Sequence, residues 1–278
     1  AANIDLAHVA NTKTDVIAIL GAGFSGDTVS AITATGNDTN ITGLSGATLS
    51  QYTFAVPGTK YQLKTSQNVQ VETDFNLLLE SFLSPDVAGC FARTMVEGRS
   101  FKSPAGMERG KILDVVRIGK VISDTEYDTM YTAGINPVRT FPEGSFLFGD
   151  KSGEAVPVTV SGDVNRTNVK VFTRINVVRT FLYLKYLIGE SPRRYLFERN
   201  DRTTRQSFIS TITPILRTVQ AGRGISEFKI VCDQSNNTQA VIDANEFVVD
   251  VFIKPTKSIN FIRLRFTNKD SNQSLATE

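Results

Sequence analysis

The sequence has 278 residues, of which 41% are hydrophobic and 21% are charged. These fractions are close to the average of globular domains, so they exclude a largely disordered chain and a fibrous repeat protein. The length is enough for about two domains of ordinary size. The longest mostly apolar run, Val16–Phe24, is far shorter than the roughly 20 residues needed to span a bilayer, so we predict no membrane insertion.

Histidine and cysteine are scarce, since His8, Cys90 and Cys232 are the full set. Zinc sites take three or four such ligands, and Ser-His or Cys-His catalysis requires a histidine base, so neither chemistry is favoured. Both cysteines lie in apolar stretches, and we expect buried free thiols in a reducing compartment rather than a disulfide. The sequence therefore predicts no catalytic residues, no metal and no cofactor.

Charge is distributed unevenly along the chain. The total is +2, but residues 1–84 carry a net charge of −4 and residues 85–278 carry +6. An acidic partner is therefore expected to bind the second part.

In chain order, the first hundred residues predict α/β structure. A helix over Asn3–Lys13 followed by a buried strand over Asp15–Leu20 is typical of the end of an α/β unit, and we expect the strand to stop at the glycines that follow. Residues 25–50 are rich in Thr, Ser, Gly and Asn, which predicts a long loop or irregular short strands. The other predicted elements are strands over Tyr52–Val56, Tyr61–Lys64 and Val69–Glu72 and helices over Thr73–Phe82 and Pro85–Met95.

The second part predicts α+β structure. Ser123 and Glu126 are spaced as a capping box at the start of a helix, and Gly134 suits its end. The predicted elements are a strand or buried segment over Ile112–Ile118, helices over Ser123–Ala133, Arg174–Ile188 and Asp201–Gln220, and strands over Phe146–Phe148, Phe228–Cys232, Glu246–Lys254 and Ser258–Thr267. The predicted fold class is mixed α/β and α+β, with a small C-terminal sheet packed by helices.

A glycine-rich motif suggests one alternative function. Gly21, Gly23 and Gly26 follow the first strand with the spacing of a dinucleotide-binding loop. However, residues 27–40 make a poor helix, and the first acidic residues that follow, Asp27 and Asp38, stand too early for the carboxylate that binds the ribose about 20 residues further on. An NAD-binding oxidoreductase domain is thus an alternative that its context disfavours.

Arginine is concentrated in one stretch, which leaves three interpretations. The guanidinium group suits ion pairs at protein interfaces because it binds carboxylates in a bidentate manner. Intramolecular pairs with neighbouring acidic residues would explain the stretch equally well, and a nucleic-acid-binding module is the third interpretation, although no recognisable motif supports it. The residues are Arg174, Arg179, Arg193, Arg194, Arg199, Arg202 and Arg205.

Eight short motifs stand in a fixed order between residues 88 and 255. They are Ala88-Gly89-Cys90-Phe91-Ala92-Arg93, Ser103-Pro104-Ala105-Gly106, Gly134-Ile135-Asn136, Gly149-Asp150, Ile175-Asn176-Val177-Val178-Arg179, Phe197-Glu198-Arg199-Asn200-Asp201, Val231-Cys232-Asp233 and Pro255. In this order they resemble the contractile tail sheath proteins of myoviruses, with a giant phiKZ-like bacteriophage as the predicted source.

The resemblance implies a structural protein and no enzyme. Sheath subunits of this family polymerise in six-fold rings around the tail tube, are joined by terminal arms that add strands to neighbouring subunits, and contract to drive the tube through the host envelope. The implied partners are other sheath subunits and the tail tube, baseplate and tail terminator proteins, without a small-molecule ligand or nucleic acid. The implied location is the tail of the virion, after assembly in the host cytoplasm.

The resemblance also implies how the chain is divided. Residues 1–100 would be the C-terminal part of the central α/β domain of a sheath protein, and residues 101–278 its C-terminal domain beside the tube. Because the sequence begins with Ala1 and Ala2 and the family has a large preceding portion, we expect that an N-terminal portion is missing.

A basic patch is predicted on the helix over Asp201–Gln220. At about 100° per residue, Arg202 and Arg217 fall about 120° and 180° from Phe208 on the apolar stripe, and Arg205 lies at the margin of the stripe. Combined with the resemblance, this predicts that Arg202, Arg205 and Arg217 face acidic residues of the tube.

The last predicted strand suggests a second contact. Arg263 and Arg265 alternate with apolar residues, and a charged face is one way in which edge strands avoid uncontrolled pairing. We predict that the C-terminal sheet has an exposed edge that accepts a neighbour's arm, with Ile259, Phe261, Arg263 and Arg265 at this inter-subunit edge.

Overall fold

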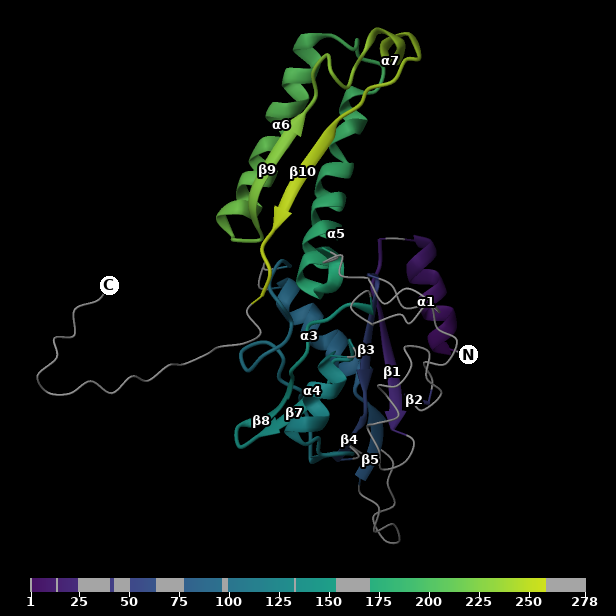
Figure 1. Ribbon diagram of the computed structural model, residues 1–278, viewed down its shortest axis with the longest axis vertical. Helices are drawn as coiled ribbons and strands as arrows, with labels where there is room; N and C mark the ends of the chain where they lie inside the picture. The colour runs from purple at the N-terminus through teal and green to yellow at the C-terminus, as the bar shows by residue number, and fades with distance from the viewer. Residues whose placement is uncertain are drawn as a thin grey trace, which may run out of the picture.

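The computed structural model describes residues 2–13, 15–24, 41–42, 51–63, 78–96, 100–132, 134–153 and 171–258. Figure 1 shows them as a lower body, formed by the first half of the chain, and an elongated upper lobe formed mostly by residues 171–258. No helix in these ranges is both long and apolar enough to cross a membrane.

The N-terminal part of the body is an α/β arrangement, as predicted. Helix α1 (Ala2–Lys13) packs beside strand β1 (Ala18–Phe24). Strand β1 pairs in parallel with β3 (Thr53–Pro57) and antiparallel with the short β2 (Ile41–Thr42).

The expectation that the first strand stops at the glycines is wrong. Gly21 pairs with Val56 in the register of β1 and β3, and the strand continues to Phe24. A Cβ atom at Gly21 would lie 2.6 Å from Ser84 Oγ, so this glycine allows a close approach within the body. Because the dinucleotide-binding motif requires a turn at its first glycine, the extended backbone argues against the NAD-binding alternative.

A second sheet corrects another prediction. Strand β4 (Thr59–Leu63) lies between β5 (Leu78–Phe82) and β6 (Arg117–Ile118), and both pairings are antiparallel. The predicted helix over Thr73–Phe82 is therefore wrong in its last five residues, while residues 73–77 lie outside the described ranges. Pairing with β4 gives β5 its backbone hydrogen bonds, and this tertiary context overrides the local helical pattern.

The predicted strand over Ile112–Ile118 is shorter than expected. Ile112 and Ile118 are buried, but the paired part is restricted to β6. Asp114 has a φ of 51°, which interrupts an extended backbone. The predicted strand over Val69–Glu72 and most of the segment 25–50 lie outside the described residues.

Two helices of the body agree with the predictions. Helix α3 (Ser84–Val96) begins with Pro85 in its first turn. Helix α4 (Asp124–Thr132) begins with the predicted capping box, since the Ser123 amide donates to Glu126 Oε2 at 2.9 Å and the Glu126 amide donates to Ser123 Oγ at 3.3 Å.

The main core lies in the body. Strands β7 (Val138–Phe141) and β8 (Gly144–Leu147) form a hairpin that contributes to it. The cluster takes residues from both sides of residue 100, so the body is packed continuously across that position. Its buried members are Phe54, Val56, Leu83, Val87, Cys90, Ile112, Ile118, Val138, Leu147, Ile175 and Val178.

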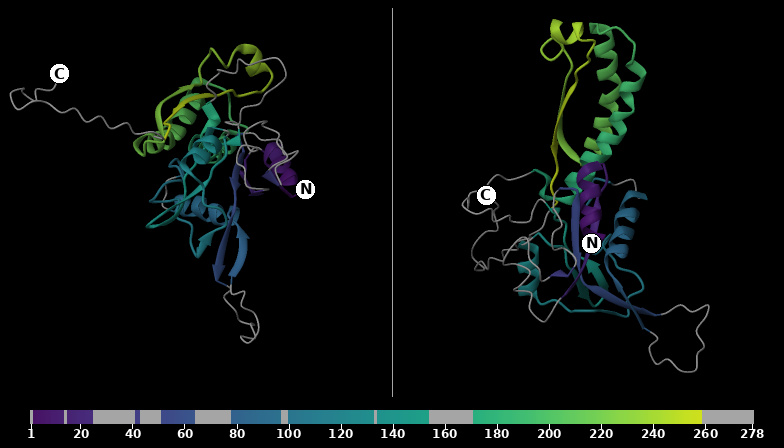
Figure 2. Two further views of the ribbon diagram at one scale, coloured as in Figure 1. Left: turned by 60° about the horizontal axis from the view of Figure 1, so that its bottom comes forward. Right: turned by 90° about the vertical axis from the view of Figure 1, so that its right-hand side faces the viewer.

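The lobe is the predicted small sheet packed by helices. Its elements in chain order are η2 (Val171–Thr173), α5 (Ile175–Gly189), η3 (Ser191–Tyr195), α6 (Arg202–Ala221), β9 (Ile225–Val231), α7 (Gln239–Asp243) and β10 (Asp250–Pro255). The 3-10 helix η2 precedes α5, η3 connects α5 to α6, and α7 connects β9 to β10. Figure 2 shows the two strands as one layer and the long helices as the other.

Cys90 and Cys232 are free and buried, as expected. Burial raises the pKa of both thiols. Because the thiolate is the reactive form, we expect neither cysteine to react with an aromatic disulfide reagent at neutral pH in the folded protein, and both to react after denaturation. Titration of thiols with and without denaturant measures this, and fast labelling of the native protein would contradict it.

Candidate subunit interface

The sheet of the lobe has one covered and one open face. Strands β9 and β10 are antiparallel, with Phe252 opposite Lys229. Phe252 is 58% exposed on the face directed away from the helices. The covered face packs against α5 and α6 through Phe228, Ile230, Val251 and Ile253. A sheet of two strands is marginally stable by itself, so this packing holds the ribbon in place.

Each strand of this two-stranded sheet has one edge that faces away from the other strand. Among the described residues, β9 and β10 pair with each other and with no other strand. The predicted inter-subunit residues Ile259, Phe261, Arg263 and Arg265 lie outside the described residues, so the role of the last strand stays a prediction.

Helix α6 presents two of the three predicted tube-facing arginines. Asp201 caps the helix by accepting a hydrogen bond from the Thr204 amide at 2.8 Å, and this bond lowers the pKa of the Asp201 carboxyl group. Arg202 and Arg217 are exposed, while Phe208 and Leu216 face the core of the lobe. The apolar stripe thus lies where the helical wheel predicts it.

Arg205 does not lie on that surface. Its side chain is 7% exposed. Its Nε donates to Asn200 Oδ1 at 2.8 Å, and its Nη2 donates to the Asn200 carbonyl oxygen at 3.2 Å. From the margin of the stripe, the long side chain reaches back to the segment before the helix, which the helical wheel could not predict.

A buried polar network closes the distal end of the lobe. Asn200 Nδ2 donates to Asn237 Oδ1 at 3.3 Å and to the Glu246 carbonyl oxygen at 2.8 Å. Asn237 is 1% exposed, accepts from the Val248 amide and donates to the Val248 carbonyl oxygen. Asn200 lies in one of the eight motifs, but neither its contacts nor Asn237 could be predicted from the sequence, because their partners are distant in the chain.

The arginine-rich stretch does not form one basic surface. Arg179 is buried on α5, where its guanidinium donates to the Phe91 and Lys102 carbonyl oxygens. Burial lowers the pKa of Arg179 to about 10. With Arg205 also buried and Arg174 paired with an acidic residue, the basic surface is smaller than the sequence implies, which weakens the nucleic-acid alternative.

A polar junction joins the body to the lobe. Asp150 is 4% exposed, and its Oδ1 accepts from Arg174 Nη1 at 2.7 Å and from the Tyr131 hydroxyl at 3.1 Å. Its Oδ2 accepts from Ser258 Oγ. Burial, together with the adjacent Asp150 carboxylate, raises the pKa of Tyr131, so the phenol stays protonated as a donor. The junction thus ties the end of β10 to the body.

An aromatic side chain reinforces this junction. Phe101, from the body, packs against Gly222 and Gly224 after α6, and a Cβ atom at Gly222 would lie 2.4 Å from its ring. Asn176 Nδ2 donates to the Thr256 carbonyl oxygen at 3.1 Å. These contacts fix the orientation of the lobe relative to the body.

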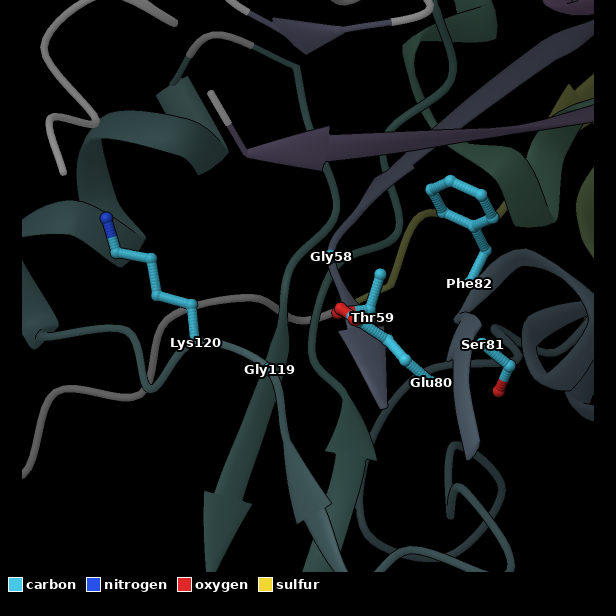
Figure 3. A pocket seen from close by; sticks show the side chains of 7 residues that line it. All are labelled: Gly58, Thr59, Glu80, Ser81, Phe82, Gly119 and Lys120. Carbon is cyan, nitrogen blue, oxygen red and sulfur yellow. The ribbon is translucent and has the colours of Figure 1, made fainter. Parts of the chain in front are cut away.

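A recess of about 500 Å³ beside β4 and β5 has no evident catalytic constellation (Figure 3). Thr59 Oγ1 donates to Glu80 Oε1 at 2.7 Å, and the Lys120 side chain points away from this pair. Among the described residues, no group of three or more His, Cys, Asp or Glu side chains could hold a metal ion.

The family comparison identifies the C-terminal part of the chain. Residues 167–269 match the family described as phage tail sheath C-terminal domain. This segment is similar to the C-terminal domain of phage tail sheath proteins. The resemblance inferred from the eight motifs is confirmed.

Two relatives extend the match beyond that domain. The chain is similar to the tail sheath protein of Enterobacteria phage T4, with 41% identity over 185 residues, which is 66% of this chain and 26% of that protein. It is also similar to the tail sheath protein of Vibrio phage KVP40, with 39% identity over 195 residues, or 70% of this chain and 27% of that protein. The chain spans about a quarter of the length of these sheath proteins.

The fold is that of contractile sheaths. The contracted helical sheath of the anti-feeding prophage matches with a TM-score of 0.69 and 17% identity, over 96% of this chain and 65% of that chain. The contracted sheath complex of the PVC extracellular contractile injection system matches with a TM-score of 0.70 and 17% identity, over 90% and 63%. The predicted mixed fold class is confirmed.

Proposed function

We propose that this chain acts as a structural subunit of a contractile phage tail sheath, which polymerises in six-fold rings around the tail tube and contracts to drive it through the host envelope. The observation that carries the proposal is the similarity to tail sheath proteins of a chain whose lobe has open strand edges. In this lobe, β9 and β10 each have one edge that pairs with no other described strand. In this role residues 1–100 would belong to the central domain of the sheath and residues 101–278 to its tube-facing domain, and the two would share the core of the body across residue 100.

Strand addition explains how such a lobe would join its neighbours. An arm from another subunit can pair with an open strand edge through main-chain hydrogen bonds. These bonds do not depend on the angle between rigid bodies, so they can persist while subunits rotate during contraction. The contacts are heterologous, and they propagate along a helix because they do not close.

The remaining partners follow from the same role. We propose that the sheath contacts the baseplate at one end and the tail terminator at the other, and that it is assembled in the host cytoplasm before it forms part of the virion. We propose a structural role without enzymatic activity, which the similarity to tail sheath proteins supports.

Charge reversal on α6 tests the tube contact. We expect that Arg202→Glu combined with Arg217→Glu leaves thermal stability unchanged, because both side chains are exposed, but impairs assembly on tail tubes. Each exposed pair contributes only about 0–1 kcal/mol, yet the contact repeats around every ring. Electron microscopy of the protein assembled with tube protein measures the length and frequency of sheathed tubes.

A matched control keeps the charge. The Arg202→Lys and Arg217→Lys variant should assemble normally if charge alone attaches the sheath. Normal assembly of the glutamate variant would refute the tube contact.

A further inference from the structure

The distal end of the lobe projects a phenylalanine into solvent. Phe197, between η3 and α6, has a relative exposure of 105% and a φ of 70°. A positive φ is a strained conformation for a bulky residue, and strain of this kind persists where the surroundings impose it and often marks functional sites. The preceding Leu196 is also 64% exposed. We call residues 196–199 the Phe197 loop.

The Phe197 loop is held firmly at both ends. On its N-terminal side, the Tyr195 ring packs edge-on against Phe208, with 5.2 Å between ring centroids, and the Tyr195 hydroxyl lies 2.7 Å from Thr211 Oγ1. On its C-terminal side, Asn200 is anchored in the buried network at the distal end. A loop fixed in this way loses little conformational entropy on binding, which favours its use as a contact.

The two layers of the distal end carry opposite charges. On the helix layer, the exposed Arg194 and Arg199 flank Phe197, and the one carboxylate between them, exposed Glu198, leaves this surface with a net positive charge. On the strand layer, α7 lies between β9 and β10 and carries exposed Asp243, with Glu246 just beyond it.

The α7 segment also offers apolar surface. None of its residues is fully buried, and Val241 and Ile242 are partly exposed. We call Val241, Ile242, Asp243 and Glu246 the α7 patch. Apolar side chains with an acidic rim complement an aromatic side chain with a basic rim.

We propose that the Phe197 loop of one copy docks on the α7 patch of a neighbouring copy. The inference rests on the proposed function, in which copies lie side by side in a ring. Phe197 is fully exposed in the single chain, so it does not cover the α7 patch of its own lobe. Because the two surfaces differ, the contact is heterologous and can repeat from copy to copy.

Charge exchange between two variants tests the proposal. Variant one carries Arg194→Glu and Arg199→Glu, and variant two carries Asp243→Arg and Glu246→Arg. We expect each variant alone to self-associate at least about tenfold more weakly than the unmodified chain, measured by sedimentation velocity over a range of concentrations. An equimolar mixture should recover association, because each modified loop then meets an oppositely charged α7 patch on the other variant.

A second pair of variants tests the aromatic anchor. Phe197→Gly relieves the positive φ, so it should leave the melting temperature unchanged or higher while weakening association about tenfold or more. Tyr186→Ala removes another aromatic side chain of the lobe, 71% exposed on α5, and should associate like the unmodified chain.

The outcomes separate this contact from the sheath role. Failure of the mixture to recover association, normal association of Phe197→Gly, or an unmodified chain that stays monomeric at every concentration would each overturn the proposed contact. None of these results would affect the sheath role, which is judged independently by sheathed tubes in the electron microscope.

Discussion

Gly149→Ala is expected to lower the free energy of unfolding by about 2–3 kcal/mol. A Cβ atom at this position would lie 2.6 Å from Asn136 Cα and 2.7 Å from Asn136 Oδ1. Backbone atoms cannot move away as a flexible side chain can, so the segment before the junction would have to shift. For a protein of this size the melting temperature should fall by about 5–10 °C.

The position of Asn136 makes this change costly. Asn136 is fully buried, and its Nδ2 donates to the carbonyl oxygens of Ala55 at 3.1 Å and Lys151 at 2.8 Å. Its Oδ1 accepts from the Lys151 amide at 2.7 Å. Displacing it would leave several buried polar groups unpaired.

Gly89→Ala is the matched control in thermal unfolding. Gly89 lies inside α3, and an added Cβ atom would meet Arg93 Nη1 at 3.6 Å, an ordinary van der Waals distance. This variant should gain about 0.5–1 kcal/mol from lower conformational entropy of the unfolded chain. Equal melting temperatures for the two variants would show that the overlap at Gly149 is relieved without cost.

Asp150→Ala is expected to destabilise the protein by about 2–4 kcal/mol, because it removes the acceptor that three donors share. Arg174, whose side chain is 20% exposed, would lose its carboxylate partner, and Tyr131 and Ser258 would lose hydrogen bonds. Since Ser258 follows β10, the attachment of the lobe should loosen as well. Denaturant unfolding measures the stability, and limited proteolysis after residue 255 reports on the attachment.

Asp124→Ala provides the control for an exposed pair. Asp124 pairs with Arg139, but its side chain is 85% exposed. Removing such a partner should cost at most about 1 kcal/mol. If Asp150→Ala proved as mild as Asp124→Ala, the polar junction would not be what holds the lobe to the body.

Local patterns predicted the helices of this protein well. Helices α5 and α6 have long apolar stripes, and α4 carries its capping box in four consecutive residues, so the information lies within the element itself. For strand β5 the sequence wrongly predicts a helix, because a short run of leucines suits either structure. Its pairing with β4 decided the outcome, and that partner is separated from it in the chain.

For the surface residues, too, local patterns predicted some positions and tertiary contacts decided the others. The helical wheel correctly placed Arg202 on an exposed face, because the stripe opposite it is contained within one helix. It could not place Arg205, whose guanidinium is taken up by Asn200, or Asn237, whose partners come from three segments.

By itself, the sequence determined the resemblance to tail sheath proteins, the main helices, the buried free thiols and the mixed fold class, because motif order, helical periodicity and composition are properties of the chain. The tertiary structure alone decided that Gly21 lies inside a strand, that Asp150 joins the lobe to the body, and that Phe197 stands exposed in a strained loop. These features depend on contacts between residues far apart in the chain, and the free energy of such contacts becomes available only once the surrounding elements have packed.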